Sequence, residues 1–107
     1  MVSRAKPAII ALKRLKKART LAVQRDLLKN CDRQLIVAIV EIISNILQNR
    51  IPLKPTQRKR LQQNAKRLQQ LAKIRSETTA RKYIVQNGGS LIPLLVGPIL
   101  SAISAFL

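Results

Sequence analysis

The 107-residue sequence has no histidine, no tryptophan, one cysteine and only four acidic residues. General acid–base catalysis needs groups that titrate near neutral pH, and a metal site needs several His, Cys or carboxylate ligands at one point. Neither set is present, so the sequence predicts no enzyme, no catalytic residue, no metal site and no cofactor. The single thiol, Cys31, lies among leucines and is interpreted as a small buried side chain, because it cannot form an internal disulfide.

Aromatic residues are also scarce, with Tyr83 and Phe106 as the only two. RNA-recognition and single-strand-binding modules stack bases on several aromatic rings, so contacts with a nucleic acid are expected to fall on phosphates instead. The first 17 residues contain no unbroken apolar run followed by a small-residue cleavage site. We therefore expect no signal peptide, and a protein that stays inside the cell.

Positive charge is in large excess, with 21 Lys and Arg against four acids and a net charge of +17. Such a charge repels itself unless a polyanion neutralises it, so DNA, RNA or anionic lipid is the expected partner. Every charged side chain lies in residues 1–89. The sequence thus predicts a basic helical nucleic-acid-binding body, residues 1–89, and an apolar tail, residues 90–107, that is a candidate for membrane contact.

The spacing of apolar residues predicts an all-α fold, a small helical hairpin or bundle with a basic surface and a C-terminal apolar tail. From Ser3 to Asn30, apolar residues recur every three or four positions between cations, which predicts one basic amphipathic helix. Residues 35–47 are apolar nearly all round and predict a buried helix of roughly 20 Å, too short to cross a bilayer. Whether this helix continues the first one through Asn30 is left open.

Two prolines after the apolar helix interrupt the periodicity and predict a turn that reverses the chain. A basic helix is then predicted from Pro55 to about Arg75. Within it, Arg60-Leu61-Gln62-Gln63 recurs seven residues later as Arg67-Leu68-Gln69-Gln70. We expect the resulting seam to pack antiparallel on residues 35–47. The residues of this seam are Leu61, Ala65, Leu68 and Ala72.

A short helix capped by Ser76 is predicted to end at Asn87-Gly88-Gly89, before the apolar tail. If the tail is helical from Pro98 on, a stripe of small residues forms at Gly97, Ser101 and Ala105, of the kind that lets helices approach in lipid. The alternative is that the tail folds against residues 35–47. Under the membrane interpretation, the contacting residues are Leu91, Ile92, Leu94, Leu95, Ile99, Leu100, Ile103 and Phe106.

The order of motifs over residues 40–107 resembles that of a known family. An Ile-Pro-Leu-x-Pro turn, a basic helix with Leu at heptad spacing, a Gln-x-Gly-Gly sequence and an apolar tail with Pro and Gly follow one another. This arrangement resembles the small basic virion proteins of polintons and adintoviruses, which are compared with the adenovirus core protein X precursor. The resemblance implies a virion protein that condenses double-stranded DNA, meets capsid proteins, and is found in the host nucleus or cytoplasm during assembly.

The same resemblance implies processing by an adenovirus-type cysteine protease. Gln86-Asn87-Gly88-Gly89 followed by Ser90 is similar to the relaxed form of that protease's site, in which Met, Ile, Leu, Asn or Gln and then any residue precede Gly-Gly. The cut would fall between Gly89 and Ser90, at the boundary between body and tail. On the residues alone, the two glycines equally suit the end of a helix.

The leading hypothesis is a virion core protein that binds duplex DNA through phosphates, without sequence preference. One rival is a membrane-active or membrane-anchored protein, whose residues 90–107 insert in lipid while the body holds anionic headgroups. Another is a small RNA-binding protein. The cations expected to neutralise phosphates are Lys13, Arg14, Lys16, Lys17, Arg19, Arg58, Lys59, Arg60, Lys66, Arg67, Lys73 and Arg75.

Overall fold

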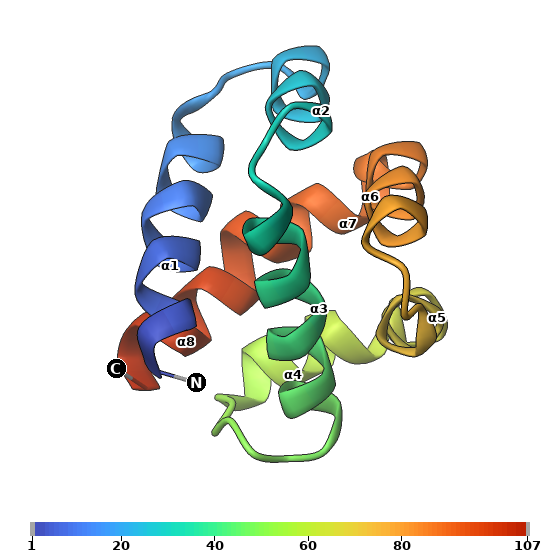
Figure 1. Ribbon diagram of the computed structural model, residues 1–107. Helices are drawn as coiled ribbons and strands as arrows, with labels where there is room; N and C mark the ends of the chain where they lie inside the picture. The colour runs from blue at the N-terminus through green and yellow to red at the C-terminus, as the bar shows by residue number, and fades with distance from the viewer. Residues whose placement is uncertain (1, 107) are drawn as a thin grey trace.

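The computed structural model describes the backbone of residues 2–106 and the side chains of residues 6–105, and over this range it contains helices and no strands (Figure 1). The predicted all-α class is therefore confirmed. The elements in chain order are α1 (Val2–Lys17), α2 (Leu21–Lys29), α3 (Arg33–Leu47), α4 (Pro55–Gln62), α5 (Ala65–Lys73), α6 (Glu77–Gln86), α7 (Gly88–Leu94), the π-helical segment η1 (Leu95–Ile99) and α8 (Leu100–Phe106).

The single N-terminal helix predicted from Ser3 to Asn30 is wrong, because the chain turns between α1 and α2. Thr20 is the N-cap of α2, and its hydroxyl accepts a hydrogen bond from the Val23 N–H at 3.2 Å. The side-chain amide of Gln24 donates to carbonyls in the last turn of α1 and the linker after it. A capping residue inside an otherwise periodic segment thus starts a new helix.

Helix α3 confirms the predicted buried helix, and it begins separately from α2. The Asp32 carboxylate caps it by accepting from the Gln34 N–H at 3.0 Å. The helix ends at Leu47, and the turn after it contains Asn49, whose φ of 59° is a left-handed conformation that Asn tolerates better than most residues. The predicted reversal of the chain follows there. The side chains that α3 buries are those of Ile36, Ala38, Ile39, Ile42, Ile43, Asn45 and Ile46.

The basic helix predicted from Pro55 to Arg75 is also divided, by a turn at Gln63 and Asn64. Leu61 and Leu68 of the heptad repeat are both buried, 5% and 1% exposed. They do not form one seam on α3, because α4 packs on η1 while α5 packs on α3. The predicted packing on α3 is therefore correct for the second half of the segment and wrong for the first, and α5 crosses α3 instead of running antiparallel to it (Figure 1).

Helix α6 has the limits that the sequence predicted, from the Ser76 cap to Gln86. The Ser76 hydroxyl accepts from the Thr79 N–H at 3.4 Å. The Tyr83 hydroxyl donates to the Gln70 side chain at 2.8 Å, which ties α6 to α5. Helices α5 and α6 lie together on the side of the molecule opposite α1 (Figure 1).

The apolar tail folds into the protein as one helical run, α7–η1–α8, behind α3 (Figure 1). Gly97 and Pro98 lie in η1, where the wider π turn accommodates a proline that has no N–H to donate. The run packs on α1, α2, α4 and α6. The radius of gyration of 12.4 Å compares with about 13 Å for a globular domain of this length, so the tail adds no extension.

Candidate nucleic-acid interface

All twelve cations predicted to meet phosphates are exposed in the structure. They lie at the end of α1, in the linker after it, on α4 and α5, and in the turn after α5. None of the twelve pairs with a carboxylate in the described part of the chain. Their charge is therefore not used inside the protein and is available to an external anion.

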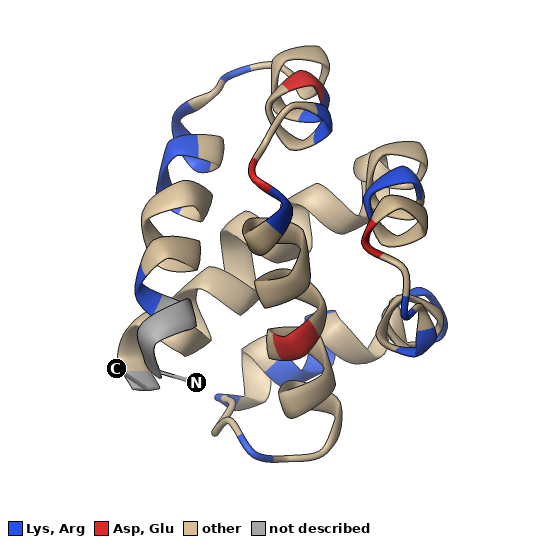
Figure 2. Cartoon of the chain, in the orientation of Figure 1, with Lys and Arg blue, Asp and Glu red and all other residues tan. Residues whose placement is uncertain are grey.

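The net charge is confined to two segments of the chain. Residues 1–25 contain eight cations and residues 50–75 contain nine, and neither segment contains an acid. The remaining residues carry four cations and four acids, which cancel. Figure 2 shows the consequence, with basic residues along α1, α4 and α5 and acidic residues only on or beside α2, α3 and α6.

The two acid-free segments meet at one place and diverge elsewhere. Lys16 of α1 lines the same hollow as Lys54 and Arg60 at α4. Helix α5, in contrast, lies on the other side of α3 from α1 (Figure 1). The positive surface thus begins on one side of the molecule, passes α4 and continues to the opposite side.

A cation outside the predicted set has a structural task. Arg81 of α6 donates from Nη1 to the carbonyls of Leu28, Lys29 and Cys31, at 2.9, 3.2 and 2.8 Å, and so caps the end of α2. It also forms an ion pair with Glu77, one helical turn earlier. Partial burial lowers the pKa of Arg81, but the hydrogen bonds and charge interactions with Glu77 and Cys31 together more than offset this, so the pKa is raised. The spacing of Glu77 and Arg81 was the signal available in the sequence.

Cys31 packs against the core, as the sequence predicted, but it is half-buried and not fully buried. Burial raises the pKa of the Cys31 thiol, and the nearby Arg81 offsets this only in part. The thiol donates to the Leu28 carbonyl at 3.1 Å. A neutral, hydrogen-bonded thiol is a poor nucleophile. Among the described residues, no group of three or more His, Cys, Asp and Glu could hold a metal ion.

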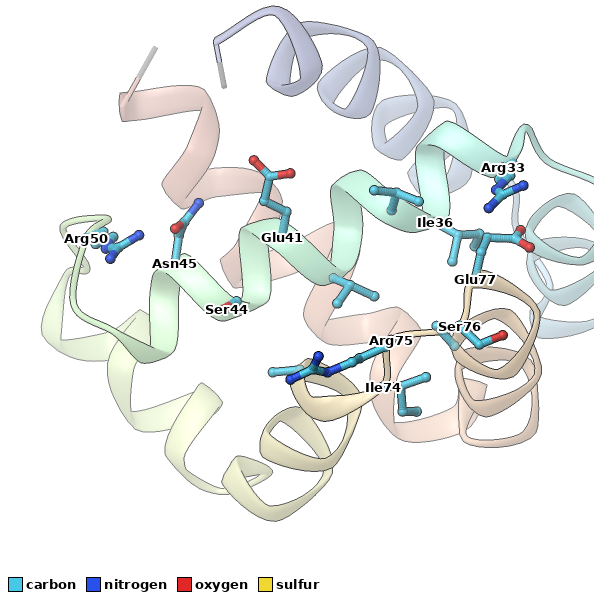
Figure 3. Close-up of a pocket in the computed structure, with 14 residues that line it drawn as sticks. Arg33, Ile36, Glu41, Ser44, Asn45, Arg50, Ile74, Arg75, Ser76 and Glu77 are labelled. Atoms are coloured by element: carbon cyan, nitrogen blue, oxygen red, sulfur yellow. The ribbon is translucent and has the colours of Figure 1, made fainter.

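A hollow of about 500 Å³ lies between α3 and the turn that joins α5 to α6 (Figure 3). Three arginines line it, Arg33, Arg50 and Arg75, together with the acids Glu41 and Glu77. In Figure 3 the Glu41 carboxylate points to the side of α3 away from Arg75. The lining has mixed charge, so this hollow is less suited to a polyanion than the surface of α1 and α4.

The residues expected to meet a membrane form the centre of the core. Seven of the eight are at most 5% exposed, and the side chain of Phe106 lies outside the described residues. By length and composition, Gly88–Ala105 is the one helix in the described part of the chain that could span a bilayer, with a mean hydropathy of 1.6, and 56% of it is buried. Of the small-residue stripe, Gly97 lies against Arg60 of α4. The other two residues of the stripe, Ser101 and Ala105, are exposed.

The residues of the expected protease site are helical in this structure. Gln86 is the last residue of α6, and Gly88, Gly89 and Ser90 form the first turn of α7. Gly88 is buried, and a Cβ added to it would lie 3.0 Å from Nε of Arg25. Gly89 is exposed, with nothing within 4 Å of an added Cβ. One glycine of the pair therefore has a packing role, and the other has none.

Comparisons with protein-family models, with curated proteins and with solved structures find no match for this chain.

Proposed function

We propose that this protein binds double-stranded DNA through its phosphates, without reading bases, and compacts it. The observation that carries the proposal is the distribution of charge: the entire net charge of +17 lies in two acid-free segments. The predicted phosphate-binding cations of these segments are exposed and unpaired in the described structure. A surface of this kind binds a polyanion by releasing its counterions, which requires no particular base sequence.

The shape of the basic elements supports binding without sequence preference. Base reading needs a few side chains fixed on a rigid helix that enters a groove. Helices α4 and α5 have only eight and nine residues and are separated by a turn. Their cations are long, exposed side chains, which suit contact with phosphates. Tyr83, the one aromatic residue with a described side chain, is hydrogen-bonded to Gln70 and offers no stacking platform.

The placement of α1 and α5 supports compaction in addition to binding. Because the two helices lie on opposite sides of α3, one molecule presents cations in two directions (Figures 1 and 2). A protein that contacts two duplexes at once neutralises both and holds them together. This is the role that the resemblance to virion core proteins implies, and the proposal extends to packaging of the protein with DNA in a particle.

Fluorescence anisotropy with labelled duplexes of different sequence tests the proposal. If 6 to 10 phosphates are contacted, the affinity should fall roughly 10³- to 10⁵-fold between 50 and 200 mM salt, equally for each sequence. Replacing Lys66, Arg67 and Lys73 together by Gln should reduce the salt slope by about three units. A salt-independent affinity contradicts the proposal, and a clear preference for duplex RNA or single strands would transfer it to RNA.

A further inference from the structure

An open hollow of about 440 Å³ lies where α1, α4 and the C-terminal helical run meet. Three cations line it: Lys16 from the end of α1, Lys54 from the turn before α4, and Arg60 from α4 itself. Two hydroxyl-bearing residues, Thr56 and Ser101, also line it. The volume is within the range of about 300 to 1,000 Å³ that is usual for ligand sites.

Among the described residues that line this hollow, none carries a carboxylate. Lys16 is far in the sequence from Lys54 and Arg60, so α1 and α4 bring these cations together only because the chain folds. Like charges held around one space repel each other, and an anion between them removes that repulsion. The hollow beside α3 differs because two acids, Glu41 and Glu77, are among its lining residues.

Gly97 and Pro98 of the C-terminal run complete the hollow. A Cβ added at Gly97 would lie 3.2 Å from Nη1 of Arg60 and 3.6 Å from its Nη2. The guanidinium therefore occupies space that any other residue at position 97 would restrict. Because glycine has no side chain, the Arg60 guanidinium can lie against the backbone of η1. The N–H donors of Arg60 then lie beside the hollow.

We propose that this hollow is a phosphate-binding pocket, in which Arg60, Lys16 and Lys54 hold one phosphate group and the hydroxyls of Thr56 and Ser101 donate to it. The inference rests on the proposed function. It states that one phosphate of the DNA backbone binds in a defined pocket, whereas the other phosphates contact cations spread over the surface. A free phosphate has the same chemistry and would occupy the same pocket. The pocket also requires η1, so phosphate binding here depends on the apolar C-terminal run.

Titration of the folded, full-length protein with inorganic phosphate at constant ionic strength, followed by amide NMR, tests the pocket. The amide shifts should be concentrated at Thr56, Gly97 and Ser101. The Arg60→Gln variant should bind phosphate about tenfold more weakly, the effect of one charge-assisted hydrogen bond. The matched control is Lys82→Gln, an exposed cation of α6 outside the interface, which should change the affinity less than twofold.

A second pair of variants leaves the charge unchanged. Gly97→Ala should displace the Arg60 guanidinium and weaken phosphate binding several-fold, whereas Gly89→Ala, with open space around its Cβ, should not. Thermal melts of both variants show whether the fold is kept. If Gly97→Ala unfolds the protein, Lys16→Gln takes its place and should also weaken phosphate binding.

Duplex DNA added to the phosphate complex distinguishes the two sources of the ligand. Displacement of phosphate, with shifts at the same amides, identifies the DNA backbone as the ligand, and an unchanged phosphate affinity identifies free phosphate. Shifts spread over all cations, with Arg60→Gln and Lys82→Gln equal, overturn the pocket even if DNA still binds. Loss of DNA binding with retention of the phosphate site would instead contradict the proposed function alone.

Discussion

The two acid-free segments and the C-terminal run have opposite chemistry and depend on each other. Residues 1–25 and 50–75 hold the whole net charge. Residues 90–107 hold no charged side chain, and more than half of the described positions among them, 90–105, are buried. Short basic helices are unstable alone, and mutual repulsion opposes their assembly. The uncharged run supplies the apolar surface on which α1 and α4 pack. The tail is thus what allows the basic surface to exist as a folded one.

The largest difference in stability is expected between two variants that carry a new aspartate, one in the C-terminal run and one in an acid-free segment. Leu95→Asp buries an unpaired carboxylate at a position that is 2% exposed, which costs several kcal/mol, comparable with the whole stability of a domain this small. Lys66→Asp places it on the exposed surface of α5, where it relieves repulsion. Circular dichroism melts should show loss of the folded state for Leu95→Asp and an equal or higher Tm for Lys66→Asp.

Ile39→Asp in α3 should unfold the protein in the same way, because Ile39 is buried in the same core. An unchanged melt for Leu95→Asp, together with an unfolded Ile39→Asp variant, would mean that the tail is an appendage of a core formed by α3. Insertion of the tail into a membrane would then need no unfolding. Because the described tail contributes eight residues to the core, its insertion must remove all eight of them.

An intermediate effect is expected at Arg81, the cation that the fold uses internally. Arg81→Gln removes the hydrogen bonds to the end of α2 and leaves Glu77 without its partner, and the stability should fall by about 2 to 3 kcal/mol. Lys82→Gln removes the same charge from the next, exposed position and should change stability by less than about 0.5 kcal/mol. Urea melts of the two variants make the comparison.

Equal effects of Arg81→Gln and Lys82→Gln would show that Arg81 does not tie α6 to α2. The affinity of the two variants for duplex DNA is an independent measurement. Both variants should lose little affinity relative to a triple substitution on α5, since neither residue belongs to the proposed interface. A large loss for Arg81→Gln in a folded protein would extend the interface to α6.

The sequence predicted the helices whose pattern was strong. The buried helix of residues 35–47 and the short helix after Ser76 were correct because composition and capping residues agreed. The breaks at Thr20 and Asn64 were missed for different reasons. Thr20 is a recognisable cap, but the periodicity on either side of it suggested continuity. Asn64 has no side-chain capping bond, and the turn there follows from α4 and α5 packing on different partners.

The candidate site was predictable only as a set of residue types. Exposure of the twelve cations follows from their long, charged side chains, which composition alone predicts. Their grouping did not follow, because the hollow joins Lys16, Arg60 and Gly97, which are separated by tens of residues. Lys54, which the sequence interpretation left out, belongs to the same group. Only the packing of η1 on α1 and α4 brings these residues together.

The smallest predicted difference in stability is between alanine variants of the two glycines at the start of the C-terminal run. Both lie in the first turn of α7, where alanine is the better helix former, so Gly89→Ala should stabilise the protein by about 0.5 kcal/mol. Gly88→Ala should lose this gain, because its Cβ would meet the Arg25 side chain at 3.0 Å. The Nε of Arg25 is buried without a hydrogen-bond partner, so the side chain has no polar contact that fixes it, and the net cost stays within about 1 kcal/mol.

The difference between the two variants decides what the glycine pair is for. If both were kept only for a protease, which must draw its substrate out as an extended strand, Gly88→Ala and Gly89→Ala would stabilise equally in urea melts. From the structure we instead expect a lower free energy of unfolding for Gly88→Ala than for Gly89→Ala. With that result, cleavage between Gly89 and Ser90 must begin with the opening of α7. A cut that releases the C-terminal run also removes Gly97, Pro98 and Ser101 from the lining of the proposed phosphate pocket. Processing would then occur before the basic surface folds or would destroy it, and it could not simply free a folded basic body.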